Sequence, residues 1–322
     1  MDPWSLELLL SRDQLSDAAR RTLARDAEKR LLHRVRPGVY VERIAFEALS
    51  PEARHIVAMR ALAAVCPTPP VFSHWSAAVL LGLPVLGREH LDRVHLTVED
   101  PADRGLVGVA AHVAPVQDGE RTVVGGLLAT ATARTVTDVA RASSFEGGVV
   151  IADGALHAGL PPATLQDAVG DSTSRKGWRK AQLAVAFADG DAESAAESLT
   201  RATMLRIRVP RPVLQWKVFD RKGLAGRLDF GFPWVPAGGE TDGEQKYRDA
   251  MMAPAGPADA VIKEKRREDR VRLEVPRLGR WGYAEARSPR LLAPILARIG
   301  VVPARPRITL ADYCSPFLRA TL

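Results

Sequence analysis

Residues Gly239-Glu240-Thr241-Asp242-Gly243-Glu244-Gln245-Lys246 place two carboxylates two positions apart and end in an amine. On a β-strand, residues i and i+2 point to the same face, so we expect Glu240 and Asp242 to project together. A third acid, Asp229, lies upstream in the apolar run Leu228-Asp229-Phe230. Acids gathered in this way repel one another unless a cation compensates their charge. The pattern therefore predicts an acidic site on strands in the C-terminal part of the chain.

The chemistry of this site follows from its oxygen ligands. Mg²⁺ and Mn²⁺ prefer carboxylates and are used in phosphoryl chemistry, and Lys246 would stabilise charge that develops on a phosphate oxygen. All seven histidines lie at or before His157, so any catalysis further along must use carboxylates, lysine and a metal-bound water. A second interpretation stays open, because Asp-Gly is a common turn pair and Glu-x-Asp is ordinary in a solvated loop.

Composition describes a globular protein with a basic balance. The chain has 322 residues, of which 46% are hydrophobic, and a formal net charge of +7. That length is enough for two or three domains, and the charge favours an acidic polymer as partner. Eight basic residues against the single acid Asp220 lie just before the acidic motif: Arg201, Arg206, Arg208, Arg211, Lys217, Arg221, Lys222 and Arg227. A basic surface beside a carboxylate site would suit a nucleic-acid phosphodiester.

Several classes of protein are disfavoured by the sequence. The only two cysteines, Cys66 and Cys314, provide neither a disulfide framework nor a cysteine-based zinc site. No apolar run approaches the roughly 18 residues of a membrane span, and residues 6–10 are too short for a signal-peptide core. We therefore expect a cytoplasmic protein with no membrane partner.

The first 45 residues predict a winged helix-turn-helix. Short helices are expected at 5–10 and from Ser11, a longer one at 16–32, and a turn and strand at 36–41. In such a domain a helix enters the major groove and the wing touches the backbone. The basic residues expected to contact DNA here are Arg20, Arg21, Arg25 and Arg36. The alternative is a solvated amphipathic helix that leads into a hairpin.

Residues 46–190 predict a mixed α+β domain. Helices are expected at 51–63, 135–142, 145–158 and 178–188, and strands at 94–98, 107–113 and 122–128. Ser73 and His74 invite a nucleophile–base interpretation, but adjacent strand residues point to opposite faces, which argues against it. His95 and His112 on expected strands are interpreted as structural.

Residues 191–322 predict a third domain, a small mixed sheet with flanking helices. Helices are expected at 192–205, 261–273 and 291–299, strands at 215–219, 227–232 and 280–284, and a loop at 233–238. The helix at 261–273 is strongly basic, and its Lys265 and Arg266 are further expected DNA contacts. The fold class is therefore multidomain α+β.

Glu197 on a helix, then Leu228-Asp229-Phe230, then Glu240-x-Asp242-Gly243-x-x-Lys246 resembles the very-short-patch-repair-type branch of the PD-(D/E)XK endonucleases. The resemblance covers roughly residues 191–300 and implies a restriction-endonuclease-like α/β domain that hydrolyses DNA with Mg²⁺ or Mn²⁺. It implies that Asp229 and Glu240 hold the metal and that Glu197 binds metal or orients water. Asp242 would be a ligand or shape the turn, and Lys246 stands where relatives often have histidine or lysine.

This sequence departs from the family pattern at two places. The position two residues after Glu240 usually carries lysine in the superfamily and is Asp242 here. Relatives also have an apolar strand leading into the glutamate, whereas this chain has Val235-Pro236-Ala237-Gly238-Gly239. Proline and glycine weaken a strand. Loss of catalysis is therefore one of the open alternatives.

The first 190 residues resemble AbiEi-type antitoxins of type IV toxin–antitoxin systems. The segments on which this resemblance rests are Arg36-Pro37-Gly38-Val39-Tyr40, Ser73 to Ala78 with Gly82-Leu83-Pro84, His95 to Val98, and Ala133-Arg134-Thr135 with Asp138. The resemblance implies a transcriptional repressor with a nucleotidyltransferase-type toxin as partner. Three hypotheses follow: a metal-dependent endonuclease targeted by its N-terminal modules, a repressor or antitoxin with an inactive nuclease-like domain, and an interaction protein that does not bind DNA.

Overall fold

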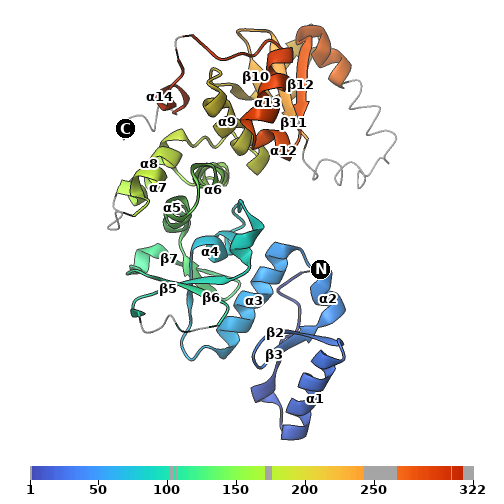
Figure 1. Cartoon of the computed structure of the whole chain (residues 1–322), viewed down its shortest axis with the longest axis vertical. Coiled ribbons are helices and arrows are strands. Elements are labelled where there is room, and N and C mark those ends of the chain that lie inside the picture. The colour runs from blue at the N-terminus through green and yellow to red at the C-terminus, as the bar shows by residue number, and fades with distance from the viewer. Residues whose placement is uncertain are drawn as a thin grey trace. The chain divides into compact units, whose positions relative to one another are not determined.

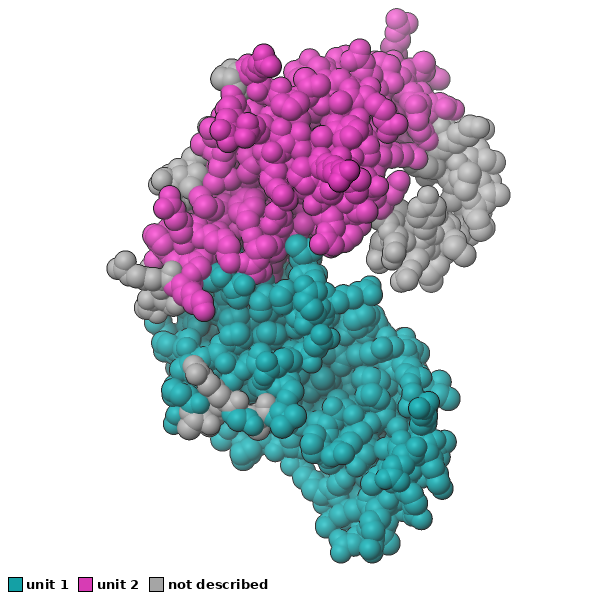
Figure 2. All heavy atoms as spheres, viewed as in Figure 1, with its two compact units in different colours: residues 1–142 teal, residues 143–322 magenta. Residues whose placement is uncertain are grey.

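The chain forms two compact units of mixed α+β structure. The computed structural model describes residues 2–101, 105, 107–170, 176–242, 267–305 and 307–314. Unit 1 is residues 1–142 and unit 2 is residues 143–322 (Figure 2). The division therefore falls at residue 142, and the expected boundary at 190 lies inside unit 2. Among the described residues, no helix is long and apolar enough to cross a membrane.

Unit 1 begins with a small module of three strands and three helices (Figure 1). Its sheet has the order β1-β3-β2, formed by Leu9–Leu10, Val39–Glu42 and Leu32–Arg36. The 3-10 turn η1 (Ser11–Asp13) and helix α1 (Asp17–Glu28) lie between β1 and β2, and α2 (Arg43–Glu47) and α3 (Pro51–Val65) follow β3. The helix expected at 5–10 is wrong, because Leu9 and Leu10 pair with Tyr40 and Val39 of β3.

The second part of unit 1 is a five-stranded sheet of order β6-β5-β4-β8-β7. The strand expected at 122–128 is instead a hairpin, because Gly125 and Gly126 adopt φ of +55° and +80° and reverse the chain. The elements are β4 (Val71–Phe72), α4 (His74–Leu80), η2 (Arg88–Leu91), β5 (Val94–Val98), β6 (Val109–Val113), η4 (Asp118–Glu120), β7 (Arg121–Val124), β8 (Leu127–Thr130) and α5 (Thr132–Ala142).

Unit 2 combines a helical layer with a four-stranded sheet of order β12-β11-β10-β9. Neighbouring strands are antiparallel except β11 and β12, which are parallel. Helix α13 packs on β12, and α9 packs on α12 and α13 (Figure 1). The elements are α6 (Phe145–His157), α7 (Pro162–Gly170), α8 (Trp178–Phe187), α9 (Ala195–Ile207), β9 (Val213–Asp220), β10 (Gly223–Phe232), β11 (Ala237–Thr241), β12 (Arg277–Trp281), α12 (Tyr283–Ala286), α13 (Pro289–Arg298) and α14 (Leu310–Tyr313).

Strand β11 begins at Ala237, inside the loop expected at 233–238, and its later part carries Glu240 on a strand as the acidic motif predicts. Its two glycines are required by close packing: a Cβ on Gly238 would lie 2.3 Å from Leu228 Cδ1, and one on Gly239 would lie 2.1 Å from Trp281 Cη2. The side chains of neighbouring strands therefore fill the space above the glycines, and sheet pairing overrides the weak strand propensity. The strand expected at 280–284 is correct only to Trp281, after which α12 begins.

A cluster of histidines lies beneath the sheet of unit 1. The rings of His74 and His112 stack with centroids 3.5 Å apart, and His95 Nδ1 lies 3.0 Å from His112 Nε2. Ser73 Oγ lies 3.0 Å from His74 Nδ1, so the argument from strand alternation was wrong: α4 begins at His74. Both side chains are buried, however, and burial lowers the pKa of His74 well below its ordinary value. The Ser73–His74 pair is therefore part of the core, and its burial argues against the nucleophile–base interpretation.

This cluster makes unit 1 sensitive to acid. Burial lowers the pKa of His95 and of His112 from 6.5 to about 4. Between these values the unfolded chain binds more protons than the folded chain, so stability is lost as the pH falls from 6.5 towards 4. Allowing for partial solvent exposure, we expect a loss of about 2 kcal/mol. Urea unfolding at several pH values measures this loss of stability.

Two variants test the assignment. His112→Gln should weaken the dependence of the unfolding free energy on pH, whereas His157→Gln, which changes an exposed ring in unit 2, should leave it unchanged. The same pH dependence in the wild type and both variants would contradict the assignment.

Candidate nucleic-acid interface and acidic site

One row of polar residues crosses the sheet of unit 2 at the acidic motif. Asp229 lies between the pairs Leu228–Trp216 and Phe230–Leu214, so Gln215 is opposite it on β9. Glu240 follows Gly239, the partner of Phe230, and it pairs directly with Arg280 on β12. The register therefore brings Gln215, Asp229, Glu240 and Arg280 together from four strands, although Gln215 and Arg280 were not singled out from the sequence.

Glu197 joins this row from the first turn of α9. Its carboxylate accepts hydrogen bonds from Gln215 Nε2 at 2.7 Å, Ser194 Oγ at 2.9 Å and the Glu193 backbone N–H at 3.0 Å. Burial raises the pKa of Glu197, and the negative charge of Asp229 adds to the rise. Gln215 has φ +48°, an uncommon conformation for a residue with a side chain, which is found more often at functional sites. Glu197 and Asp229 are thus electrostatic neighbours.

The acids of the motif itself have separate partners. Asp229 Oδ2 accepts hydrogen bonds from Thr241 N at 2.7 Å and Thr241 Oγ1 at 2.8 Å. Glu240 forms ion pairs with Arg267 at 2.8 Å and Arg280 at 3.0 Å. Burial lowers the pKa of Arg280, but the charges of Glu240, Glu268 and Asp242 outweigh it and raise that pKa. The negative charges of Glu240 and Asp242 therefore act on the same arginine.

The described residues do not assemble the expected metal ligands. No group of three His, Cys, Asp or Glu side chains is placed to hold a metal ion among the residues that the structure describes. Glu240 is already compensated by two guanidinium groups, so Asp229, Glu240 and Asp242 do not fit Mg²⁺ or Mn²⁺ in this arrangement. Lys246 lies outside the described residues.

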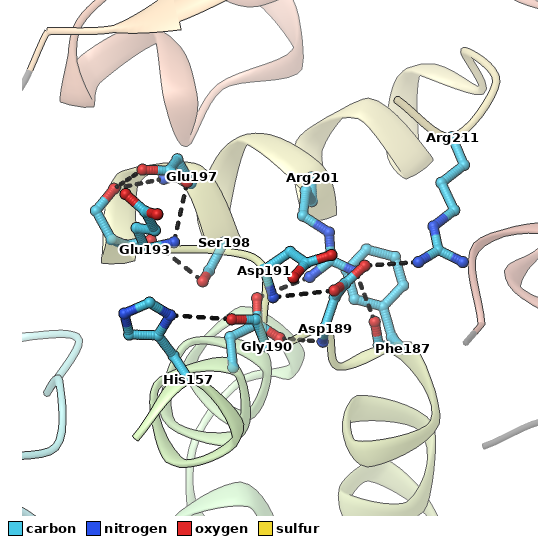
Figure 3. Close-up of polar contacts among 12 residues, drawn as sticks. His157, Phe187, Asp189, Gly190, Asp191, Glu193, Glu197, Ser198, Arg201 and Arg211 are labelled. Carbon is cyan, nitrogen blue, oxygen red and sulfur yellow. Dashed lines mark hydrogen bonds and ion pairs between the residues drawn. The ribbon is translucent and has the colours of Figure 1, made fainter. Parts of the chain in front are cut away.

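The basic run before the motif is only partly a surface. Arg201 lies in the core: its guanidinium pairs with Asp153 at 2.7 Å, and both side chains are 1% exposed. The same guanidinium donates to the Phe187 carbonyl at 2.7 Å (Figure 3). Arg211 pairs with Asp189 at 2.6 Å and Arg227 with Glu193 at 2.6 Å. Arg201 is therefore part of the core, and the interpretation of the whole run as a phosphate-binding surface was wrong for it. Arg227, whose side chain is 49% exposed, forms a surface pair that can exchange for phosphate.

The expected DNA contacts of unit 1 differ in exposure. Arg20, Arg21 and Arg25 are exposed on α1, where Arg20 pairs with Asp17 at 3.1 Å and Arg25 donates to Thr22 at 3.0 Å. Surface contacts of this kind are weak enough to exchange for phosphate. Arg36 on β2 is half-buried, and burial lowers its pKa. Lys265 and Arg266 lie outside the described residues.

Comparison of the sequence with known proteins identifies two relatives, neither with a described function. Two proteins of Mycobacterium tuberculosis, from the strains CDC 1551 / Oshkosh and ATCC 25618 / H37Rv, are 30% identical to this chain over 193 residues, and both are described as uncharacterized. The match covers 60% of this chain and 66% of each relative, slightly less than two thirds of their length. No family model matches the chain, and no solved structure does.

The Arg201–Asp153 pair should dominate the stability of unit 2. Replacing Asp153 with Asn leaves the buried guanidinium with only the more distant Asp189, at 3.8 Å, as counter-charge, and breaking such a buried pair typically costs about 3–5 kcal/mol. Urea unfolding followed by circular dichroism measures this loss. The double variant Asp153→Leu, Arg201→Met removes both charges and should lose less than Asp153→Asn alone. A loss below about 1 kcal/mol for Asp153→Asn, the range of an exposed pair, would contradict the assignment.

Proposed function

We propose that this protein binds DNA through its N-terminal module and acts as a transcriptional regulator of the AbiEi antitoxin type. The observation that carries the proposal is the exposed arginine face of α1 directly before the β2–β3 hairpin. A helix followed by a hairpin is common to a winged helix and to a solvated amphipathic helix that leads into a hairpin, and the three arginines gathered on the exposed face of α1 favour the winged helix. The proposed partners are DNA and a nucleotidyltransferase-type toxin.

The module is built to present α1 rigidly. Ser16 caps the helix by accepting a hydrogen bond from the Ala19 N–H at 3.2 Å, and Leu23 is the buried residue of the helix. Arg20, Arg21 and Arg25 stay exposed, so their charges are available to a phosphate backbone. A fixed helix with a free cationic face supports backbone contacts that set the register of the protein on a duplex.

Replacing Arg20, Arg21 and Arg25 together with alanine should weaken DNA binding and its salt dependence. Each lost phosphate contact lowers the slope of log K against log salt by about 0.9, so a decrease of up to about 3 is expected. Fluorescence anisotropy with a labelled duplex from 50 to 300 mM salt, about the range used for such slopes, measures it.

The matched control removes the same charge from other elements. Arg88 of η2, Arg179 of α8 and Arg290 of α13 are also exposed, and their triple alanine variant should keep a slope near that of the wild type. Equal slopes in the wild type and the α1 variant, or an equal loss in both variants, would remove α1 as the DNA-binding element.

A metal-dependent endonuclease is the second candidate. The proximity of Glu197 and Asp229 favours it, because two buried carboxylates beside a strained Gln215 are unusual outside a functional site. The ion pairs of Glu240 favour instead a nuclease-like domain that does not cleave.

Incubation with supercoiled plasmid and linear duplex in Mg²⁺, Mn²⁺ or EDTA distinguishes the two candidates. The regulator predicts binding without nicking in any of these conditions. Metal-dependent nicking that is absent from the Glu240→Ala variant would establish the nuclease and contradict the proposal that unit 2 does not cleave DNA. Nicking that Glu240→Ala retains would point to a contaminating nuclease.

A further inference from the structure

Glu240, the central acid of the sequence motif, is held by two arginines from different elements. We infer that Arg267 and Arg280 take the place of a divalent cation at Glu240 and keep a metal ion out of this site. Arg267 donates to Glu240 Oε1 at 2.8 Å, and Arg280 lies 3.0 Å from Glu240 Oε2. Each carboxylate oxygen therefore has its own guanidinium partner.

Burial makes these ion pairs stronger than ordinary surface contacts. The side chain of Glu240 is 13% exposed, and those of Arg267 and Arg280 are 27% and 43% exposed. Arg280 also lies 3.5 Å from Glu268, which pairs with Arg272 at 2.7 Å. Two guanidinium groups therefore already face Glu240, and both would repel a divalent cation brought to this carboxylate.

The backbone fixes both arginines where they are. Arg280 is the direct partner of Glu240 across the parallel β11–β12 pair. Arg267 begins the described part of a helix at 267–274, whose Val271 packs on the sheet with Val218 and Leu228. The helix is thereby held over β10, and this explains why the arginine reaches across to the acid.

The side chain of Arg267 passes close to a glycine of β10, Gly226. A Cβ on Gly226 would lie 2.7 Å from Val271 Cγ2, 3.0 Å from Arg267 Nη1 and 3.3 Å from Arg267 Cγ, closer than ordinary packing allows. Arg267 Nη1 also donates to the Arg227 carbonyl at 3.2 Å. The glycine thus leaves room beside the sheet for the Arg267 side chain, so the fold itself supports the contact of this arginine with Glu240. This inference concerns unit 2 and does not depend on DNA binding by α1.

Manganese binding without DNA tests the inference. The electron paramagnetic resonance signal of free Mn²⁺ would be titrated with the full chain at neutral pH. The wild type should bind weakly, and the double variant Arg267→Gln, Arg280→Gln should bind at least about tenfold more tightly because two opposing charges are gone. Adding Glu240→Gln to the double variant should abolish the gain. Arg272→Gln, which removes one charge from the same helix without touching Glu240, should behave like the wild type.

The outcomes separate the inference from its alternatives. Tight Mn²⁺ binding by the wild type that the double variant leaves unchanged would overturn it, as would a gain that survives Glu240→Gln or is matched by Arg272→Gln. If the double variant does not fold by circular dichroism, the single variant Arg280→Gln, at the more exposed arginine, carries the same expectation with a smaller gain. Because no DNA is present, a failed DNA-binding experiment would leave this result unaffected.

Discussion

The buried ion pair between Arg201 and Asp153 is the interaction on which unit 2 depends. It joins α9 to α6, with both side chains 1% exposed. Taking two charges out of water is expensive, and the pair is stable only because further contacts surround it. The Asp189 N–H donates to Asp153 at 2.8 Å, and the Arg201 guanidinium lies 4.6 Å from the centre of the Phe187 ring. The helices from 143 to 187 are therefore part of the same folding unit as the sheet.

The position of α9 determines the acidic site in turn. Glu197 lies one helical turn before Arg201, so the pair that anchors α9 also fixes the carboxylate that meets Gln215. On the opposite flank of the site, the β11–β12 register places Arg280 beside Glu240. Packing of α9 and pairing of the strands thus bring residues from four distant segments to one place.

Sequence patterns predicted the elements better than the roles of charged residues. The spacing of hydrophobic residues identified α1, α3, α6, α8, α9 and β5, because the period of these residues in the sequence matches the face of each element that packs in the core. Charge counting could not distinguish the buried Arg201 from the exposed Arg206, since both carry the same side chain. The start of β11 at Ala237 and Gly238 was missed, because local propensity does not show that the side chains of Leu228 and Trp281 fill the space above Gly238 and Gly239. Gln215 carried no sequence signal at all, since its importance comes from its place opposite Asp229.

The proposed account gives the two units different tasks. It assigns DNA-backbone contacts to the exposed arginines of α1, whereas Arg201 and Arg267 of unit 2 are paired with acids and serve the fold. Hydrogen–deuterium exchange of the full chain, with and without a duplex at low salt, tests this division most directly. The account predicts slowed exchange on DNA binding at residues 17–42 and unchanged exchange in β9 to β12. Protection confined to unit 2, with α1 unaffected, would contradict it.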